Sequence, residues 1–238
     1  MIIKFYNYLF LLKLLLPFKL KKISPRKLII LITILVIVDQ ISKIYIKLNF
    51  PLNLYGTPPI IDWGFFKLLF VENKGMAMGA KLSDIIPFLS ENLSKLLLTV
   101  IRLIAICGIG YWLKISFNNK LASPLFLLSL SLIFAGAVGN IIDSVFYGVL
   151  FSHSYGQVAT FMPDEGGYAT IFYGSVVDMF QFPLISWNWP DWMPFWGGEP
   201  YTFFQYVFNF ADTYVSIGVI IILFFNRKVF TQDGQVNS

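Results

Sequence analysis

Four long apolar runs constrain this chain more than any other feature of its sequence. They lie at roughly 28–47, 93–114, 124–146 and 205–226, and a helix needs about 17 to 25 residues to cross a bilayer. Hydrophobic residues make up 57% of the 238 residues and charged residues 13%, a composition outside the range of ordinary soluble domains. The sequence therefore predicts an integral membrane protein with four transmembrane helices.

Basic residues are distributed unevenly around these runs. Residues 1–27 are basic, Lys114 and Lys120 flank the short second-to-third connection, and residues 227–238 begin with two cations, whereas 144–208 contains no Lys or Arg. The positive-inside rule then predicts that both termini and the short connection are cytoplasmic. The net charge of +5 is thus explained by topology, and we expect no nucleic-acid partner.

This distribution divides the chain into three regions. Residues 1–27 are predicted to form a basic cytoplasmic or interfacial leader, 28–226 the membrane domain, and 227–238 a cytoplasmic tail. The outer connections of the domain are 48–92 and 147–204. The first contains short β-prone runs punctuated by Gly, which predict a small sheet. The second is acidic, and its Trp-rich stretch is typical of a loop in the headgroup belt.

In three of the apolar runs, a carboxylate lies three or four positions from a second polar residue, and an unpaired charge in such a run costs about 2.5 to 3.5 kcal/mol. Asp39 and Lys43 are spaced i,i+4 in the first run, so they either neutralise each other as an ion pair or support a polar site. The other polar residues share a helical face within their run: Asn140 and Asp143 in the third, and Asn209 and Asp212 in the fourth. Buried polar faces need polar partners from elsewhere in the chain.

These polar residues are predicted to lie at a common depth. At about 1.5 Å per residue, Asn140 lies about 24 Å along the third run, and Asp212 lies about 10 Å from the outer end of the fourth. Asp39 and Lys43 fall in the outward half of the first run, and Asp178 lies in a short β-prone run of the outer connection. Polar groups therefore collect near the outer surface, as in an active site.

Carboxylates are the candidate catalytic groups. The chain has no Gly-x-Ser-x-Gly turn, its single cysteine, Cys107, is expected to be a small core residue, and its single histidine, His153, makes a zinc site improbable. Two nearby carboxylates in a low-dielectric site cannot both ionise easily, so one keeps a proton. Such a pair can activate water and hydrolyse a peptide bond without metal or cofactor.

Five sequence blocks, in this order, closely resemble the lipoprotein signal peptidase (signal peptidase II) family. The blocks are Asp39–Lys43, Asn73–Ala77, Gly139–Asp143, Val176–Phe180 and Phe208–Asp212. Each block alone is weak, whereas five in order among four apolar runs are highly specific. The expected fold is membrane α-helical, with four transmembrane helices, a small extracytoplasmic β-sheet cradle and an inserted aromatic outer loop.

The resemblance implies an aspartic endopeptidase of the bacterial cytoplasmic (inner) membrane. Such an enzyme removes the signal peptide from a diacylglyceryl-modified prolipoprotein, cleaving before the lipidated cysteine. By the same likeness it is a monomer whose partners are this substrate and membrane lipids, and it needs no cofactor or metal. Asp178 and Asp212 would be the catalytic dyad near the outer face. The supporting residues would be Asp39, Lys43, Asn73, Asn140, Asp143 and Asn209.

The chain departs from the family pattern in one substitution and two insertions. Ser144 stands where the family usually has arginine, so a supporting charge contact is missing or comes from elsewhere. The aromatic insertions 144–175 and 183–200 extend the outer segment. The first separates Asp143 from Asp178, which leaves open that Asp143, and not Asp178, is the partner of Asp212.

Other interpretations of the carboxylates belong to different classes of protein. A small proton-coupled transporter or lipid-binding membrane protein could use Asp39, Asp143 and Asp212 as relay or headgroup contacts. Transport predicts polar groups in the cytoplasmic half, which the sequence does not show. A non-enzymatic assembly factor gains nothing from several carboxylates at one depth. Arg102, deep in the second run, either snorkels or pairs with a carboxylate from another span.

Overall fold

The computed structural model describes residues 23–54, 57–74, 86, 89–119 and 122–224. Most of the predicted leader, all of the predicted tail and the end of the Asn73–Ala77 block therefore lie outside the described residues.

Three long helices begin at serines that cap them. They are α2 (Pro25–Asn49), α4 (Glu91–Asn118) and α5 (Pro124–Ile142). The preceding serines are Ser24, Ser90 and Ser123, and each side-chain Oγ accepts a hydrogen bond from the backbone N–H three residues later. A serine at this position satisfies one of the N–H groups that a helix start leaves without a partner. In α2 and α5 a proline at the first helical position, with its fixed φ, reinforces the start.

Helix α5 continues into a π-helical turn, η2 (Asp143–Tyr147), and a short helix, α6 (Gly148–Leu150). Among the described helices, α2, α4 and the continuous segment Pro124–Leu150 are long and apolar enough to cross a membrane. The fourth apolar helix, α7, is shorter and spans Phe210–Phe224. It begins five residues later than the expected 205, because Val207–Phe208 pair in the sheet as strand β6.

The outer surface of the helices is apolar. Ile30, Ile41 and Ile104 are 58%, 63% and 66% exposed, a pattern that suits contact with lipid chains. The chain is thus a multi-pass helical membrane protein, as the apolar runs predict. Cys107 is also exposed on α4, so the expectation that it packs in the core is wrong.

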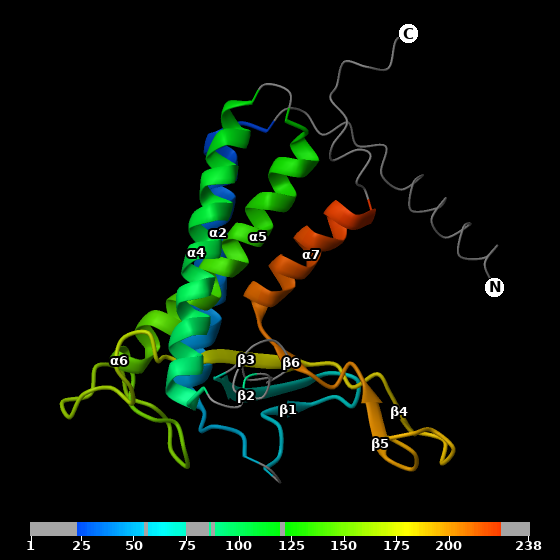
Figure 1. The fold of residues 1–238 in the computed structure, drawn as a ribbon. Helices are drawn as coiled ribbons and strands as arrows, with labels where there is room; N and C mark the ends of the chain where they lie inside the picture. Colours follow the sequence, from blue (N-terminus) through cyan, green and yellow to red (C-terminus); the bar gives the residue numbers. More distant parts are fainter. Residues whose placement is uncertain (1–22, 55–56, 75–85, 87–88, 120–121, 225–238) are drawn as a thin grey trace.

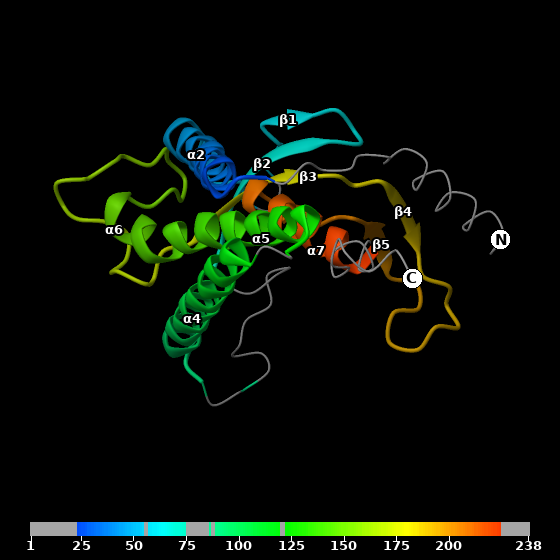
Figure 2. The ribbon, with the colours of Figure 1, turned by 90° about the horizontal axis from the view of Figure 1, so that it is seen from above.

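Helix α5 lies at the centre of the bundle and packs against α2, α4 and α7 (Figure 2). Glycines allow the closest approach. A Cβ added at Gly136 would collide with the backbone oxygen of Ala211 and lie 2.7 Å from Val215 Cγ2 on α7. Small residues at such positions let two membrane helices come close enough for their backbones to pack. This close approach brings the start of α7 to the polar end of α5.

A small antiparallel sheet lies across one end of the bundle (Figure 1). Its order is β1-β2-β3-β6, with β1 at Ile61–Asp62, β2 at Lys67–Asn73 and β3 at Val176–Gln181. The sheet predicted for the first outer connection is therefore confirmed. Val71 on β2 faces Asp178 on β3, so Asp178 sits on a strand.

An apolar core joins the sheet to the helices. It contains Ile46, Phe70, Tyr147, Phe151, Val177 and Met179, all buried. Beside this core, the Lys47 ammonium lies 2.5 Å from Glu72 Oε1 and donates to Ser154 Oγ at 2.9 Å. This buried ion pair fastens α2, β2 and the start of the first insertion to one another.

The second insertion forms a separate hairpin of β4 (Ile185–Asn188) and β5 (Pro200–Phe203). The hairpin extends sideways from the sheet (Figure 1). Trp192 and Phe195 near its tip are 80% and 94% exposed. Contact of these aromatic side chains with the headgroup region stays a prediction.

We predict that Gly136→Ala lowers the thermal stability of the protein in detergent, because its methyl group would force α5 and α7 apart. Overpacking of this kind costs about 1 to 3 kcal/mol. Gly108→Ala on α4 is the matched control, since a Cβ there meets nothing within 4 Å. Equal melting temperatures for the two variants would contradict the close packing of α5 on α7.

Candidate active site

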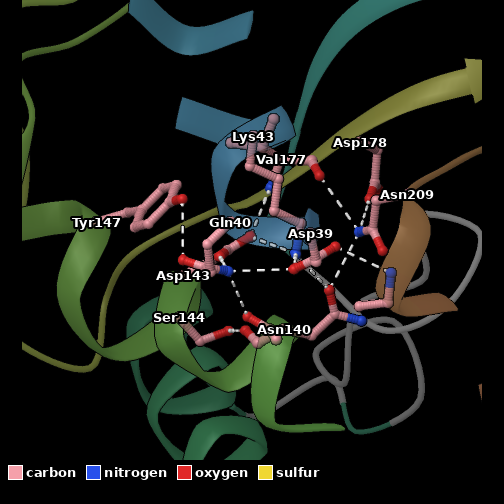
Figure 3. Close-up of polar contacts among 12 residues, drawn as sticks. Asp39, Gln40, Lys43, Asn140, Asp143, Ser144, Tyr147, Val177, Asp178 and Asn209 are labelled. Atoms are coloured by element: carbon pink, nitrogen blue, oxygen red, sulfur yellow. Dashed lines mark hydrogen bonds and ion pairs between the residues drawn. The ribbon is translucent and has the colours of Figure 1, made fainter. Parts of the chain in front are cut away.

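The residues singled out from the sequence converge where α2, α5, η2, the sheet and the start of α7 meet (Figure 3). Asp39, Lys43, Asp143 and Asn209 are 0% exposed, and Asp178 is 3% exposed. Throughout the described part of the chain, every buried side-chain nitrogen and oxygen has a hydrogen-bond partner. The site is therefore a fully connected polar network within an apolar protein.

Lys43 links two carboxylates and one amide. Its ammonium lies 2.9 Å from Asp39 Oδ2 and 2.9 Å from Asp143 Oδ2, and it donates to Asn140 Oδ1 at 2.9 Å. These three acceptors match the three protons of an ammonium. The Asp39–Lys43 ion pair that the i,i+4 spacing predicts is present. Asp143 on η2 adds a second carboxylate to the same ammonium.

Asp39 also fixes the start of α7. Its Oδ1 accepts a hydrogen bond from the Ala211 backbone N–H at 2.9 Å. Asn209 caps the same helix, since its Oδ1 accepts from the Asp212 N–H at 2.9 Å and Asp212 Oδ2 accepts from the Asn209 N–H at 3.3 Å. This reciprocal arrangement has the logic of a capping box. The sequence predicts that Asn209 and Asp212 share one face of a helix, but Asn209 precedes α7 and caps it, so this prediction is wrong.

Two asparagine amides connect the carboxylates of Asp178 and Asp212. Asn209 Nδ2 donates to Asp178 Oδ1 at 2.6 Å and to Asn140 Oδ1 at 3.1 Å, and Asn140 Nδ2 donates to Asp212 Oδ1 at 2.7 Å. From β2, Asn73 Nδ2 donates to Asp178 Oδ2 at 3.1 Å. The two carboxylates are therefore held by one set of hydrogen bonds, with Asp212 only half-buried.

The environment of Asp178 favours its protonated form. Burial, and then the negative charge of Asp212, raise the pKa of Asp178 to about 7, against the opposing effects of the Asn73 and Asn209 hydrogen bonds and the Lys43 charge. A carboxyl group with a pKa near neutrality can donate a proton at physiological pH.

The π-helical turn η2 explains how the first insertion rejoins the site. The Ser144 backbone oxygen accepts a hydrogen bond from the Gly174 N–H at 2.9 Å, and the Val145 oxygen accepts from the Phe172 N–H at 3.1 Å. A Cβ at Gly174 would collide with the backbone oxygen of Asp143, so only glycine allows this approach. These contacts hold the segment that leads directly into β3 and Asp178.

Two site residues were not singled out by sequence reasoning. Gln40 Nε2 donates to Asp143 Oδ1 at 2.9 Å and to the Gly139 oxygen at 3.1 Å, and Gln40 Oε1 accepts from Tyr147 Oη at 3.1 Å. Gln40 lies inside the Asp39–Lys43 block, and Tyr147 follows Asp143 by four residues, a spacing that places side chains on one helical face. Both signals are in the sequence, but neither specifies the partner.

Helix α4 contributes Arg102, whose Nη1 donates to Ser144 Oγ at 3.4 Å. The guanidinium also interacts electrostatically with Asp212 and, more weakly, with Asp178. Of the two alternatives for Arg102, the structure thus favours pairing toward the carboxylates. Among the described residues, no three His, Cys, Asp or Glu side chains are grouped as metal ligands.

We predict that Lys43→Met strongly destabilises the protein, because the carboxylates of Asp39 and Asp143 would stay buried without their cation. Breaking a buried ion pair in this way costs about 3 to 5 kcal/mol. Lys67→Met is the matched control, since the Lys67–Asp62 pair is exposed to solvent and such pairs contribute about 0 to 1 kcal/mol. Thermal unfolding in detergent measures both, and similar melting temperatures would contradict the role of Lys43.

Comparison with known proteins places this chain in a family. The family described as Signal peptidase (SPase) II matches residues 31–227. The lipoprotein signal peptidase of Porphyromonas gingivalis is 47% identical over 193 residues, covering 81% of this chain and 79% of that protein. That of Amoebophilus asiaticus is 33% identical over 201 residues, covering 84% of this chain and 77% of that protein.

Solved structures agree at the level of the fold. One described as a bacterial membrane enzyme determined by the in meso method at 2.3 Å resolution aligns with a TM-score of 0.52 and 23% identity, covering 91% of this chain and 98% of that chain. Together with the sequence matches, which span most of both proteins, this likeness extends across the helices and the sheet. The chain therefore belongs to the signal peptidase II family.

Proposed function

We propose that this protein is an aspartic endopeptidase that removes the signal peptide from diacylglyceryl-modified prolipoproteins, cleaving before the lipidated cysteine. Membership of the signal peptidase II family supports the substrate class. The catalytic mechanism is supported by the pair of carboxylates, Asp178 and Asp212. Two asparagine amides connect them, and the negative charge of Asp212 raises the pKa of Asp178.

In the proposed mechanism, Asp212 is ionised and Asp178 is protonated. Asp212 takes a proton from a water molecule as the water oxygen attacks the scissile carbonyl carbon, while Asp178 donates its proton to the carbonyl oxygen. The tetrahedral diol then collapses. Asp212 returns a proton to the leaving nitrogen, the C–N bond breaks, and Asp178 recovers its proton from a diol hydroxyl. The pair ends in its starting state.

The hydrogen bonds of Asp143 argue against it as the partner of Asp212. Asp143 Oδ2 lies 2.9 Å from the Lys43 ammonium and accepts from the Val177 N–H at 3.2 Å, while Oδ1 accepts from Gln40. Both carboxylate oxygens of Asp143 are thus engaged by groups other than Asp212, whereas Asp178 is connected to Asp212 through the amides of Asn209 and Asn140. We therefore assign the proton-donating role to Asp178 and a positioning role to Asp143.

The proposed topology has both termini in the cytoplasm and the site near the outer face of the bacterial inner membrane. The basic residues around the apolar runs support this orientation. A diacylglyceryl-modified substrate keeps its acyl chains in the bilayer, so its scissile bond lies close to the headgroups. The sheet at that end of the bundle would support the extended peptide, and the enzyme would act as a monomer surrounded by lipid.

The transporter alternative is disfavoured by the far half of α5. There, the buried hydroxyls of Ser129 and Ser131 donate to backbone oxygens of their own helix, Leu125 at 2.8 Å and Leu127 at 2.7 Å. These bonds are local and do not connect to the carboxylates. In the described helices, the charged cluster is therefore confined to the end that carries the sheet.

We predict that Asp178→Asn and Asp212→Asn each lower cleavage by about 100-fold or more, because each removes one proton-transfer group. The chain is expressed in cells depleted of their own lipoprotein signal peptidase, and processed lipoprotein is separated from its precursor by gel mobility. Asp62→Asn, which alters an exposed carboxyl group on β1, is the control and should process normally. Full activity of Asp178→Asn together with loss in Asp143→Asn would reverse the assignment.

The pKa of Asp178 predicts the pH dependence of cleavage. Asp178 must carry a proton to act as the acid, so kcat/KM should fall as pH rises through about 7. The Asn73 hydrogen bond lowers the pKa of Asp178, so Asn73→Ala should move this alkaline limb to higher pH. A pH–rate profile with a purified lipopeptide substrate measures both, and a shift to lower pH in Asn73→Ala would contradict the proposal.

A further inference from the structure

Helix α4 presents a polar face to the segment that leads to Asp178. Its members are Lys95, Thr99 and Arg102, at i, i+4 and i+7, so they lie on one side of the helix. Lys95 Nζ donates to Ser175 Oγ at 3.5 Å, and Thr99 Oγ1 donates to the Phe172 backbone oxygen at 3.2 Å. All three side chains contact the segment between η2 and β3 or η2 itself, so α4 contributes polar contacts to the site as well as a surface for lipid.

Arg102 reaches the carboxylate pair through a short chain of contacts. Its Nη1 donates to Ser144 Oγ, and Ser144 Oγ in turn donates to the Asn140 backbone oxygen at 3.0 Å. Figure 3 shows Ser144 beside Asn140. The side chain of Asn140 holds Asp212. The guanidinium interacts electrostatically more strongly with Asp212 than with Asp178.

The partners of the buried cations indicate what Arg102 contributes to the site. The three protons of Lys43 are taken up by Asp39, Asp143 and Asn140, so its direct bonds serve the other two carboxylates of the site. Arg102 approaches the pair of Asp178 and Asp212 from α4, whereas Lys43 lies on α2. The charged groups facing the pair and its surroundings among the described elements are Asp39, Lys43 and Lys47 on α2, Glu72 on β2, Lys74 after it, Lys95 and Arg102 on α4, and Asp143 on η2.

We propose that Arg102 is a positioning residue that keeps Asp212 as the ionised member of the catalytic pair, which leaves the shared proton on Asp178. Two adjacent carboxylates with one proton have two arrangements, and only one has the base on α7 and the acid on β3. A cation that interacts more strongly with Asp212 than with Asp178 favours that arrangement. Ser144 orients the guanidinium through its hydroxyl. This inference rests on the proposed aspartic mechanism.

The test compares charge at position 102 with charge elsewhere on α4. Arg102→Gln should lower kcat/KM by about 10- to 100-fold and move the acid limb of the pH–rate profile to higher pH, with a smaller change in KM. Arg102→Lys should recover part of the rate because it keeps the charge. Lys114→Gln is the matched control, since Lys114 is an exposed cation on the same helix, and it should behave as wild type.

A charge transplant guards against simple misfolding. In the double variant Arg102→Gln/Ser144→Arg, the positive charge is supplied from position 144 on η2, the contact partner of Arg102. Activity and the acid limb should therefore recover toward wild type. Melting temperatures in detergent are measured for every variant. An Arg102→Gln enzyme with the rate and pH profile of Lys114→Gln would overturn the inference. If Arg102→Gln does not fold, Arg102→Lys is compared with the uncharged variant Arg102→Met. The inference would then be overturned by an Arg102→Lys enzyme whose acid limb is unchanged and whose rate is below that of Arg102→Met.

The same experiment separates this inference from the proposed function. Wild-type protein that leaves the lipopeptide uncleaved, or an Asp178→Asn variant that cleaves it normally, would contradict the aspartic mechanism itself. Normal dependence on Asp178 and Asp212 combined with indifference to Arg102 would contradict only the role of the arginine.

Discussion

The structure depends on one buried cation, the ammonium of Lys43. Charged groups are costly within a bilayer. Several carboxylates gathered at one depth would repel one another, and each would lose its hydration in the low-dielectric surroundings. Lys43 binds Asp39 and Asp143 from two different helices, and Asp39 then binds the first turn of α7. The contacts of Lys43 and Asp39 together fix α2, η2 and α7 relative to one another. Gly139 makes room for this contact, since a Cβ there would lie 2.6 Å from Asp39 Oδ2.

The asparagines extend that framework to Asp178 and Asp212. Asn140 accepts from Lys43 and donates to Asp212, and Asn209 caps α7 while donating to Asp178. Structural and candidate catalytic carboxylates are therefore distinguished by their partners. Asp39 and Asp143 are bound by the Lys43 ammonium, whereas Asp178 accepts hydrogen bonds from the amides of Asn73 and Asn209, and its raised pKa allows it to keep a proton near neutral pH. The proposed division of roles between acid and base follows from this difference in surroundings.

Much of the fold follows from local sequence patterns, because apolar run length and i,i+4 spacing act within one helix. The four helices, the Asp39–Lys43 pair and the polar face of Asn140 and Asp143 are of this kind. Other features depend on contacts between distant segments. The start of α7 at Phe210 depends on pairing of β6 with β3, and the π-helical turn depends on the return of the insertion at Gly174. The approach of Arg102 to Ser144 depends on how α4 is rotated against α5, which no local pattern specifies.

Whether Asp178 and Asp212 share one proton is best measured by infrared spectroscopy of the purified protein across a pH titration. A protonated carboxyl group has a carbonyl band distinct from the carboxylate bands. We expect a component of this band to disappear as pH rises through about 7, and we expect that component to be missing from the Asp178→Asn variant. A band that is unchanged in Asp178→Asn, or no carboxyl group titrating near neutral pH, would contradict the account.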